Sequence, residues 1–438
     1  MYYARAPLLI VDFTNKADII HFGVISQIDL NVPITSLTFR RGLVDSIMYI
    51  VAMIDFAISL YFFHALGLAF FKALVVGLFF LLGMFSFRVY EIKNLKSLLN
   101  QILRVFVGIA AYNVVLHILS YGIPWIHVIE LSVVLSLVNL IAFVLLLKLV
   151  PERTYIVDAD DFKDLEGIFK EIEEKTLGKI HFKPANPHIL EYPREDVVAT
   201  SQNLQEILKN SPAIYELAER YLKRIPVEII ERFEEHYHEV FSSFSDYRGK
   251  RFLDIVVSAA GLILFSPIML LAALLIFIED GRPIVFKQKR YGKNREVFVM
   301  YKFRSMLNDK NCPGGKFATD EEHRIMKTGK LMRTFRIDEV LQFINVLKGD
   351  MSVVGPRPEQ IDLAEKFEKE ITPYKFRYAA RPGITGWAQL RYKYATNTYE
   401  TMQKLSYDLW YIKNESFLLD ILIMLQTPEA MLFRRGAK

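Results

Sequence analysis

Four long apolar blocks, separated by short polar segments, dominate the first third of the chain. They cover roughly residues 43–63, 66–87, 100–120 and 124–149. Each is close to the ~20 residues that an α-helix needs to cross a bilayer core. Helices in a soluble core would be shorter and would carry a polar face. We therefore expect a four-helix transmembrane bundle over residues 43–150, preceded by an N-terminal cytoplasmic segment, residues 1–42.

Basic residues are spread unequally over the connections between these blocks. The connection between the second and third blocks carries Arg88, Lys93, Lys96 and Arg104, whereas the turn at 121–125 has no basic residue. The positive-inside rule then places both ends of the bundle in the cytoplasm. Lys72 is the exception and would have to snorkel near the outer face. Asp55, within the first block, is either a functional residue or a buried hydrogen-bonded one.

The next hundred residues alternate between strand-like and helix-like patterns. The segments 154–160, 179–182 and 195–200 favour strands, and residues 164–178 favour a helix that ends at Gly178. Strands alternating with helices predict a cytoplasmic α/β (Rossmann-like) domain over residues 151–247. A G-x-G-x-x-G turn is missing from this sequence, so no dinucleotide is assigned. Regulation, oligomerisation or spacing are the roles we expect.

A further apolar block, residues 252–279, is long enough to cross a membrane but has Ser266-Pro267 at its centre. Proline removes a backbone hydrogen bond, and the serine hydroxyl can satisfy the freed carbonyl. Basic residues flank both ends of the block, which favours a re-entrant membrane helix that enters and leaves by the cytoplasmic face. An ordinary kinked span is the alternative.

The remaining pattern predicts a mainly α domain over residues 248–438. Residues 283–306 have the alternation of a small β-hairpin, and a helix carrying Lys327, Lys330 and Arg333 follows a polar loop. The charged stretch 359–379 is expected to be helical. The tail, 417–435, is either an interfacial helix or a helix that packs on the core.

An acidic pair, Asp338-Glu339, begins an apolar-periodic run that Lys348-Gly349 ends. This predicts a short helix with Asp338 at its N-cap. The N-terminus of a helix attracts phosphate. Two carboxylates beside such a site could bind Mg²⁺, attack phosphorus or move a proton. The simpler interpretation is that Asp338 is a helix cap and Glu339 a favourable charge in the first turn.

Composition narrows these choices. Of 438 residues, 52% are hydrophobic and the mean hydropathy is +0.21, which suggests a membrane component. A formal charge of +5 suits anionic headgroups or phosphorylated substrates, and no motif points to nucleic acid. The single cysteine, Cys312, excludes an intrachain disulfide and suggests a reducing compartment. We expect no cleavable signal peptide in residues 1–20.

Candidate phosphate-binding groups gather in the last third of the chain. They are Lys302, Arg304, Arg333, Arg357 and Arg381. Two rigid turns accompany them, Gly355-Pro356-Arg357-Pro358 and a second at residues 381–387, whose glycines could let backbone N–H groups approach an anion. With a membrane helix leading into this region, the arrangement indicates phosphoryl-transfer chemistry at the inner membrane surface with a lipid-borne partner.

Residues 249–435 resemble the bacterial sugar transferase family, the monotopic polyprenyl-phosphate phosphoglycosyl transferases. The resemblance rests on FLDIVVSAAGLILFSP, KQKRYGKNREVFVMYKFRSM, RTFRIDEVLQFINVLKGDMSVVGPRPE, RPGITGWAQL and YDLWYIKNES. The preceding apolar blocks and α/β segment resemble the large subfamily, which primes O-antigen, capsule or exopolysaccharide synthesis. Many members have Ser-Leu before the acidic pair and Leu-Pro after it. Here Phe335-Arg336-Ile337 precede the pair, and Val340-Leu341 follow it.

The resemblance implies a two-step transfer at the cytoplasmic face of the bacterial inner membrane. Asp338 would attack a nucleoside diphosphate sugar, a UDP-hexose by expectation, and undecaprenyl phosphate would then accept the sugar phosphate. Mg²⁺ would be held by Asp338, and Glu339 would accept a proton or position the lipid phosphate. Phosphate would meet Lys302, Arg333 and Arg357, and Asp408 would bind the sugar or support the site. A homodimer is implied. The sequence does not identify the sugar, and a non-catalytic scaffold for polysaccharide assembly is the alternative.

Overall fold

The computed structural model describes most of the chain. The described residues are 43–91, 98–119, 121–150, 152–157, 159–184, 213–307, 325–392, 395 and 397–432, with only the backbone described for 43–48, 149, 159–161 and 432. The N-terminal segment 1–42, the expected strand 195–200, Lys93, Lys96 and Cys312 lie outside these ranges. The chain divides into two compact units, Met1–Tyr221 and Leu222–Lys438.

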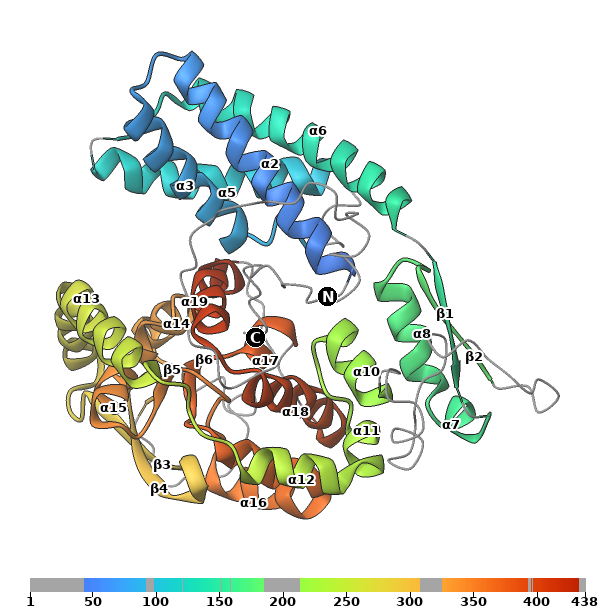
Figure 1. Cartoon of the computed structure of the whole chain (residues 1–438). Coiled ribbons are helices and arrows are strands. Elements are labelled where there is room, and N and C mark those ends of the chain that lie inside the picture. The colour runs from blue at the N-terminus through green and yellow to red at the C-terminus, as the bar shows by residue number, and fades with distance from the viewer. Residues whose placement is uncertain are drawn as a thin grey trace, which may run out of the picture. The chain divides into compact units, whose positions relative to one another are not determined.

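Four helices form the first part of unit 1 (Figure 1). They are α2 (Leu43–Ala65), α3 (Phe70–Ser86), α5 (Leu98–Ile118) and α6 (Trp125–Leu149). Helix α2 packs against α3 and α6, and α5 packs against the same two helices. The backbones of α3 and α5 touch, because a Cβ atom on Gly83 would lie 2.3 Å from the Gly108 carbonyl oxygen. Small residues allow such close approach between apolar helices.

Two of these helices, Leu98–Ile118 and Trp125–Lys148, are long and apolar enough to cross a bilayer. Tyr49–Ala65 and Phe70–Ser86 are apolar helices of shorter length. These apolar helices are compatible with a membrane protein, as the composition predicts. Asp55 is fully buried in the bundle, and its carboxylate accepts a hydrogen bond of 2.8 Å from the Tyr90 hydroxyl. This matches the buried, hydrogen-bonded alternative for Asp55.

The rest of unit 1 contains a β-α-β arrangement. Strand β1 (Arg153–Val157) and strand β2 (Ile180–Pro184) pair in parallel, and α7 (Ala159–Asp164) and α8 (Glu166–Lys175) connect them. Helix α8 covers the pair through Phe169, whose ring stacks 4.4 Å from that of Phe182. Helix α10 (Ile214–Leu222) runs up to the boundary between the units. The described part of this segment therefore has α/β character, with two strands in its sheet.

Unit 2 is mainly helical, with two short pairs of strands (Figure 1). Its first half contains α11 (Val227–Arg232), α12 (Glu234–Ser242), α13 (Lys250–Asp280), β3 (Val285–Tyr291), η2 (Lys293–Arg295), β4 (Val297–Phe303), α14 (Lys327–Thr334), η4 (Ile337–Glu339), α15 (Gln342–Lys348) and β5 (Ser352–Val354). Its second half contains α16 (Ile361–Glu370), η5 (Thr372–Ala379), β6 (Gly383–Thr385), α17 (Trp387–Arg391), α18 (Thr398–Lys413) and α19 (Phe417–Leu432). The predicted hairpin is confirmed, since β3 and β4 pair antiparallel.

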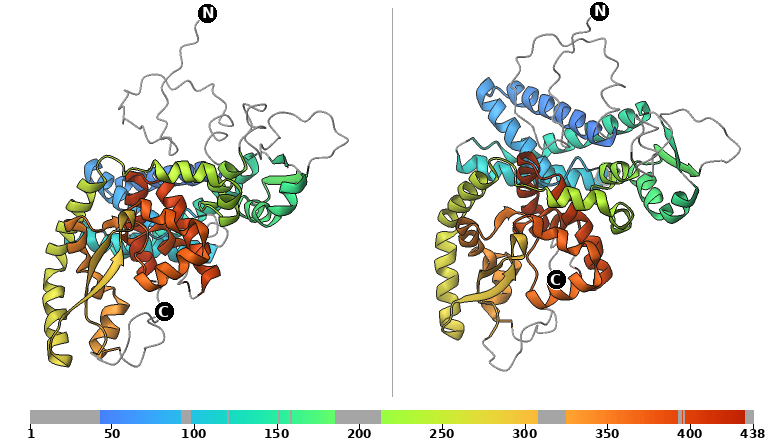
Figure 2. Two further views of the ribbon diagram at one scale, coloured as in Figure 1. Left: turned by 90° about the horizontal axis from the view of Figure 1, so that it is seen from below. Right: turned by 60° about the horizontal axis from the view of Figure 1, so that its bottom comes forward.

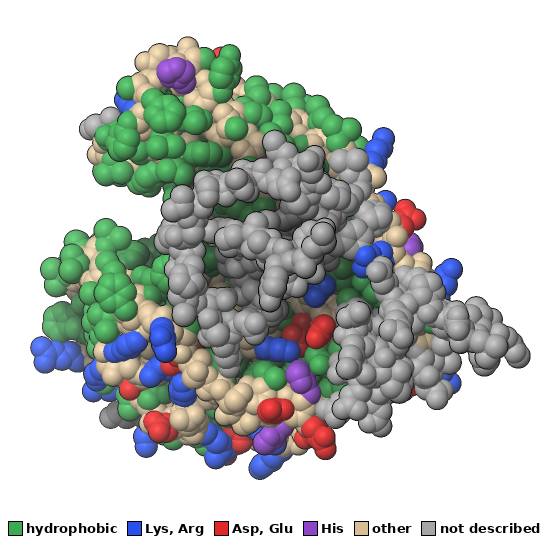
Figure 3. Space-filling model, in the orientation of Figure 1, with side chains coloured by type: hydrophobic (Ala, Val, Ile, Leu, Met, Phe, Trp, Pro, Cys, Tyr) green, Lys and Arg blue, Asp and Glu red, His purple; other side chains and the backbone are tan. Residues whose placement is uncertain are grey.

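Helix α13 is 31 residues long and continues through Pro267 without a break. The Ser266 hydroxyl donates a 2.8 Å hydrogen bond to the Ile263 carbonyl, the group that the proline leaves without its helical partner. The ribbon of α13 bends along its length (Figure 2). Its apolar side chains are largely exposed, among them Ile263 at 75% and Leu270 at 74%. Hydrophobic side chains gather on its surface (Figure 3), and the helix is long enough to cross a membrane.

The first turn of α13 is fixed to the body of unit 2 by buried charges. The Lys250 ammonium lies 2.7 Å from Asp420 Oδ2 and 3.5 Å from Glu415 Oε2, and it donates a 2.8 Å hydrogen bond to the Tyr411 hydroxyl. One turn later, the Asp254 carboxylate accepts hydrogen bonds of 2.8 Å from the Ser352 hydroxyl and the Val353 N–H. The membrane helix is therefore joined directly to β5.

The two Gly/Pro turns pack against each other as a parallel pair, β5 with β6. The Gly355 N–H donates to the Thr385 carbonyl and the Gly383 N–H to the Pro356 carbonyl, both at 2.9 Å. A Cβ atom on Gly383 would lie 2.1 Å from the Gly355 nitrogen. The expectation that the glycines of the second turn leave N–H groups free for an anion is therefore wrong for Gly383. Glycine is needed here because two main chains approach closely.

Candidate active site

The acidic pair lies in its own short turn between two helices. Helix α14 ends at Thr334, and Arg336 then adopts a left-handed conformation with φ of 56°. That residue begins the 3₁₀ turn Ile337–Glu339, and α15 starts later, with Leu341 at its N-cap position. The prediction that Asp338 caps the helix is therefore wrong, because the reversal at Arg336 inserts a separate turn. The predicted helix end is confirmed, since Gly349 has a φ of 96°.

Glu339 is buried among three cationic side chains. Its Oε1 atom lies 2.5 Å from Arg357 Nη2 and 3.3 Å from the Lys302 ammonium, and its Oε2 atom lies 3.4 Å from Arg336 Nη1. Burial acts to raise the pKa of Glu339, but Arg357 and Lys302 outweigh it and hold the pKa well below its usual range. Glu339 is thus an ionised group that orders the cations around it.

Asp338 faces the opposite electrostatic balance, although it is the adjacent residue. Burial, followed by the charge of Glu339, raises its pKa, and the nearby cations oppose this rise without cancelling it. Its side chain is 8% exposed, and its Oδ1 atom accepts no hydrogen bond from any residue that the structure describes. A buried oxygen without a donor is costly, and such groups are usually satisfied by a ligand, an ion or water.

Lys302 and one further cation, Arg333, border Asp338. Lys302 comes from strand β4, and burial lowers its pKa while Glu339 acts to raise it. Arg333 comes from the last turn of α14, and its Nε–H donates a 3.0 Å hydrogen bond to the Ser305 hydroxyl. Charges of Lys302, Arg333 and Arg336 all act to lower the pKa of Asp338. The hairpin, α14 and the 3₁₀ turn together form a cationic surround for one carboxylate.

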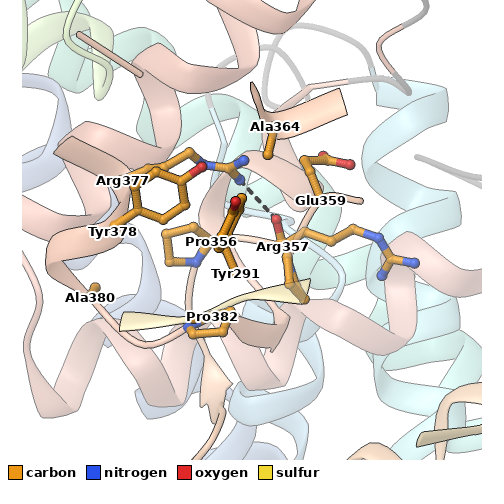
Figure 4. Close-up of a pocket in the computed structure, with 11 residues that line it drawn as sticks. Tyr291, Pro356, Arg357, Glu359, Ala364, Arg377, Tyr378, Ala380 and Pro382 are labelled. Atoms are coloured by element: carbon orange, nitrogen blue, oxygen red, sulfur yellow. Dashed lines mark hydrogen bonds between the residues drawn. The ribbon is translucent and has the colours of Figure 1, made fainter. Parts of the chain in front are cut away.

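The first Gly/Pro turn, Gly355-Pro356-Arg357-Pro358, positions Arg357, and two other arginines bind the backbone of this turn. Arg377 donates a 2.8 Å hydrogen bond to the Arg357 carbonyl, and Arg290 donates a 3.0 Å hydrogen bond to the Pro358 carbonyl. The guanidinium of Arg357 points away from the pocket behind the turn, whereas Arg377 lies in it (Figure 4). That pocket has a volume of about 20 Å³, room for roughly one water molecule. It supports the turn and is too small for a sugar nucleotide.

Three of the predicted phosphate or sugar ligands are held elsewhere. Arg304 donates a 2.8 Å hydrogen bond to the Asp280 carbonyl and pairs with the Asp280 carboxylate, which closes the C-terminal end of α13. Arg381 is bound to Asp246 and to the Gly349 carbonyl. Asp408 is buried in an ion pair of 3.2 Å with Arg377. Asp408 therefore acts on the Gly/Pro turn through Arg377, and Arg304 and Arg381 stabilise the frame around the site.

Sequence patterns did not assign a role to three residues that shape this site. The sequence assigned no role to Arg336, yet its left-handed backbone begins the turn Ile337–Glu339 and its side chain pairs with Glu339. Arg377 lies in a charged helical stretch that gave no signal. Glu359 follows the Gly/Pro turn, and although burial opposes it, Lys404 and Arg377 lower its pKa to about 2. The place of Glu359 directly after GPRP was the one available signal for it.

The carboxylates of the site could bind a metal ion only together with a substrate. Among the residues that the structure describes, no group of three or more His, Cys, Asp or Glu side chains could hold one. Mg²⁺ is commonly bound by one or two carboxylates together with substrate phosphates, so a dedicated cage is not required. The unpaired Oδ1 of Asp338 fits that mode, whereas both oxygens of Glu339 are engaged by cations.

Known proteins resemble the region that carries this site. A family model described as bacterial sugar transferase matches residues 245–434. The uncharacterised sugar transferase EpsL of Bacillus subtilis is 37% identical over 188 residues, which are 43% of this chain and 89% of that protein. The chain belongs to the bacterial sugar transferase family. The matched residues include Asp338, Glu339 and the cations around them, so the site lies inside the region common to the family.

Two longer relatives carry names that state an activity. A UDP-N-acetylgalactosamine-undecaprenyl-phosphate N-acetylgalactosaminephosphotransferase of Aeromonas hydrophila is 46% identical over 189 residues. A UDP-glucose:undecaprenyl-phosphate glucose-1-phosphate transferase of Klebsiella pneumoniae is 42% identical over 180 residues. These matches cover 43% and 41% of this chain, and 45% and 39% of the two relatives. The chain thus matches less than half the length of these relatives.

Proposed function

We propose that this protein transfers a sugar 1-phosphate from a nucleoside diphosphate sugar, a UDP-hexose, to undecaprenyl phosphate. The reaction would be the first membrane step of O-antigen, capsule or exopolysaccharide synthesis. The carrying observation is Asp338, a buried carboxylate with one unpaired oxygen beside several cations. The names of the Aeromonas and Klebsiella relatives support the two substrate classes.

The first step forms a covalent bond to Asp338. An oxygen of its carboxylate attacks the phosphorus that carries the sugar, and an Asp338–O–P bond forms. The bond from that phosphorus to the bridging oxygen breaks, and the oxygen leaves with the electron pair as part of the nucleoside monophosphate. In the second step a phosphate oxygen of undecaprenyl phosphate attacks the same phosphorus and displaces Asp338. A covalent intermediate splits one difficult transfer into two easier ones.

Glu339 supports this reaction by positioning the cations that bind phosphate. Because its pKa is held well below the usual range, it is a weak proton acceptor at neutral pH. Its two oxygens engage Lys302, Arg336 and Arg357, and this fixes three long side chains beside Asp338. Preorganised cations stabilise charge that develops on a transferred phosphoryl group. The expected roles were to accept a proton or to position the lipid phosphate, and the contacts of Glu339 support a role in positioning cations.

Mg²⁺ fits this site as a partner of Asp338 and the substrate phosphates. When bound, it would neutralise the charge of the diphosphate and ease departure of the nucleoside monophosphate. The protein contributes one carboxylate oxygen, Asp338 Oδ1, together with Lys302 and Arg333 as further positive charges. The raised pKa of Asp338 implies that a cation beside it would favour its ionised form.

The proposal includes a membrane arrangement. Four N-terminal spans would place the α/β (Rossmann-like) domain and the catalytic unit on the cytoplasmic face of the bacterial inner membrane, as a homodimer. The bend and the Ser266–Ile263 hydrogen bond support a re-entrant α13. A tag at residue 438 should then react with an impermeant label only after the cells are lysed, and labelling of intact cells would contradict this topology. Replacing Pro267 with Leu should straighten the helix.

The decisive experiment is to trap the covalent adduct. The protein is incubated with a panel of UDP-sugars without acceptor, and intact-mass spectrometry should find a sugar-phosphate adduct that maps to Asp338. Asp338→Asn should lose the adduct and at least about a thousandfold of the rate of UMP release, because the nucleophile is gone. Asp362→Asn, at an exposed position on α16, is the matched control and should keep both.

The other outcomes separate the alternatives. UMP release by Asp338→Asn at near wild-type rate would rule out the covalent mechanism and favour direct transfer to the lipid phosphate. No UMP release by the wild-type chain with any UDP-sugar, with undecaprenyl phosphate and Mg²⁺ present, would refute the proposed activity.

A further inference from the structure

A second recess in unit 2 is distinct from the acidic pair. It is a groove of about 510 Å³, open to solvent, between the end of α13, the β3–β4 hairpin and α15. The residues that line it are Arg282, Pro283, Ile284, Val285, Lys287, Tyr301, Leu341, Ile344 and Lys348. Its volume lies within the roughly 300–1,000 Å³ of sites that bind small molecules. It is thus much larger than the pocket behind the Gly/Pro turn.

The groove has an apolar floor and a cationic rim. Ile284, Leu341 and Ile344 belong to the floor, and their neighbours Ile276 and Phe303 continue it into the packed core. Arg282, Lys287 and Lys348 are exposed at the rim, and none of the described lining residues is acidic. A surface with three positive charges over apolar side chains is complementary to an anion with a hydrocarbon tail.

Of the two carboxylates nearest in sequence to this rim, Asp280 is paired with Arg304, whereas Asp350 acts electrostatically on Lys348. Asp280 is paired with Arg304 at 3.1 Å, and Asp350 accepts a 3.1 Å hydrogen bond from the Asn345 amide. Lys348 instead donates a 2.9 Å hydrogen bond to the Tyr301 hydroxyl, which places its charge at the mouth of the groove. The rim therefore has three cations, and of these two carboxylates only Asp350 acts on their charge.

The position of the groove relates it to lipid. The exposed apolar surface of α13 extends to Ile278, which is 71% exposed, and Arg282 follows one turn later. Leu347, beside Lys348, is also exposed, at 36%. Basic side chains at the end of a membrane helix lie at the level of the lipid headgroups. The rim cations are also different residues from those that contact Glu339.

We propose that this groove binds one anionic phospholipid, with its phosphodiester at Arg282, Lys287 and Lys348 and the first part of an acyl chain on Ile284, Leu341 and Ile344. The lipid would fix the end of α13 against α15, next to the turn that carries Asp338 and Glu339. The inference goes beyond the proposed transfer reaction, because the lipid is bound and not consumed.

The test is lipid binding by the full chain in detergent. Native mass spectrometry with added phosphatidylglycerol or phosphatidylcholine should find a retained phosphatidylglycerol adduct and little phosphatidylcholine. The double variant Lys287→Gln, Lys348→Gln should bind phosphatidylglycerol about thirtyfold more weakly, since each of the two cations contributes about 1 kcal/mol near a lipid phosphate. The control Lys289→Gln, Lys369→Gln removes the same charge at exposed positions outside the groove and should bind as the wild type does.

Each result decides the proposal independently of catalysis. Equal binding of the two lipids, or equal loss in both double variants, would overturn it, because the attraction would then be general charge. A groove variant that keeps the phosphatidylglycerol adduct but shows a raised KM for undecaprenyl phosphate would also overturn it and assign the groove to the acceptor. A second variant, Ile344→Gln, should weaken the adduct by removing apolar contact while leaving the rim charges in place.

Discussion

Unit 2 contains two buried charge clusters with opposite compositions. The site cluster comprises Lys302, Arg333, Arg336, Asp338, Glu339 and Arg357, and the anchor cluster comprises Lys250, Asp254, Glu415 and Asp420. The site cluster has four cations for two carboxylates, whereas the anchor cluster has one cation for three. Burying charge is costly in both, unless each ion finds a partner. The sign of the excess charge indicates which kind of ion or group would neutralise each cluster.

The anchor cluster is satisfied only in part, since Glu415 Oε2 lies 3.5 Å from the Lys250 ammonium but accepts no hydrogen bond from the described residues. Lys250 and two tyrosine hydroxyls serve Asp420, and burial followed by the charge of Asp420 raises the pKa of Glu415 to about 7 although Lys250 opposes it. The excess negative charge can therefore be relieved by a proton. The site cluster has excess positive charge and an unpaired Asp338 oxygen, which a diphosphate and a divalent cation would complete. Each cluster therefore contains a carboxylate oxygen without a hydrogen-bond donor among the described residues, and the two clusters differ in the sign of their excess charge.

The largest predicted effect comes from removing the anchor cation. Lys250→Met should lower the stability of unit 2 by about 3–5 kcal/mol, because it leaves buried carboxylates without a partner. Thermal unfolding in detergent should show a melting temperature lower by roughly 10 °C. The control is Lys293→Met, whose ion pair with Asp246 is partly exposed and should contribute about 1 kcal/mol or less. Equal melting temperatures for Lys250→Met and wild type would show that Lys250 does not stabilise unit 2.

The second prediction concerns pH. The pKa of Glu415 is raised from 4.5 to about 7 in the folded protein, so its contribution to stability is complete below pH 4.5 and is lost as the pH rises through 7. A shift of this size corresponds to at most about 3 kcal/mol. Glu415→Gln should therefore gain stability relative to wild type between pH 5 and pH 8, measured by thermal unfolding. The control Glu228→Gln, at an exposed position, should differ from wild type in melting temperature by the same amount at pH 5 and pH 8. The same result for Glu415→Gln would contradict the raised pKa of Glu415.

The smallest predicted effects separate cations of the site from cations of the frame. Arg333→Gln should raise the KM for the UDP-sugar about tenfold with little change in melting temperature, because it removes one charge beside Asp338. Arg304→Gln should leave the KM unchanged and lower stability by about 1–3 kcal/mol, because it leaves the end of α13 without its donor. Steady-state kinetics and thermal unfolding on both variants check this pair. A raised KM for Arg304→Gln with unchanged stability would instead indicate that Arg304 binds the substrate phosphate.

Sequence patterns identified the elements of unit 2 better than their contacts. The alternation at 283–306 and the glycine after Lys348 are local signals, and the hairpin and helix end follow from them. The N-cap prediction for Asp338 failed because one positive φ at Arg336 interrupts the helix, and arginine carries no signal for that conformation. Local propensity therefore predicted where the turn lies but not its form.

The charged residues show a related limit. Lys302, Arg333 and Arg357 were grouped with Arg304 and Arg381 because all five are basic and close to glycine turns. The structure separates them by partner, since Arg304 meets the end of α13 and Arg381 meets Asp246. Which carboxylate a basic side chain meets depends on long-range packing, which a single sequence does not contain. Asp408 was expected to bind the sugar or to support the site, and its ion pair with Arg377 agrees with the second role.

The close contact between Gly355 and Gly383 helps to set the distance between helix α13 and Arg357. Asp254 on α13 is bonded to β5, β5 lies backbone to backbone on β6, and Arg357 follows β5 by three residues before it meets Glu339. Each link in that series is a direct contact with no long flexible loop between its members. The series therefore sets the distance between Arg357 and helix α13. A larger residue at Gly355 or Gly383 would force the two backbones apart, so Arg357 would be displaced relative to α13 even if every side chain of the site remained.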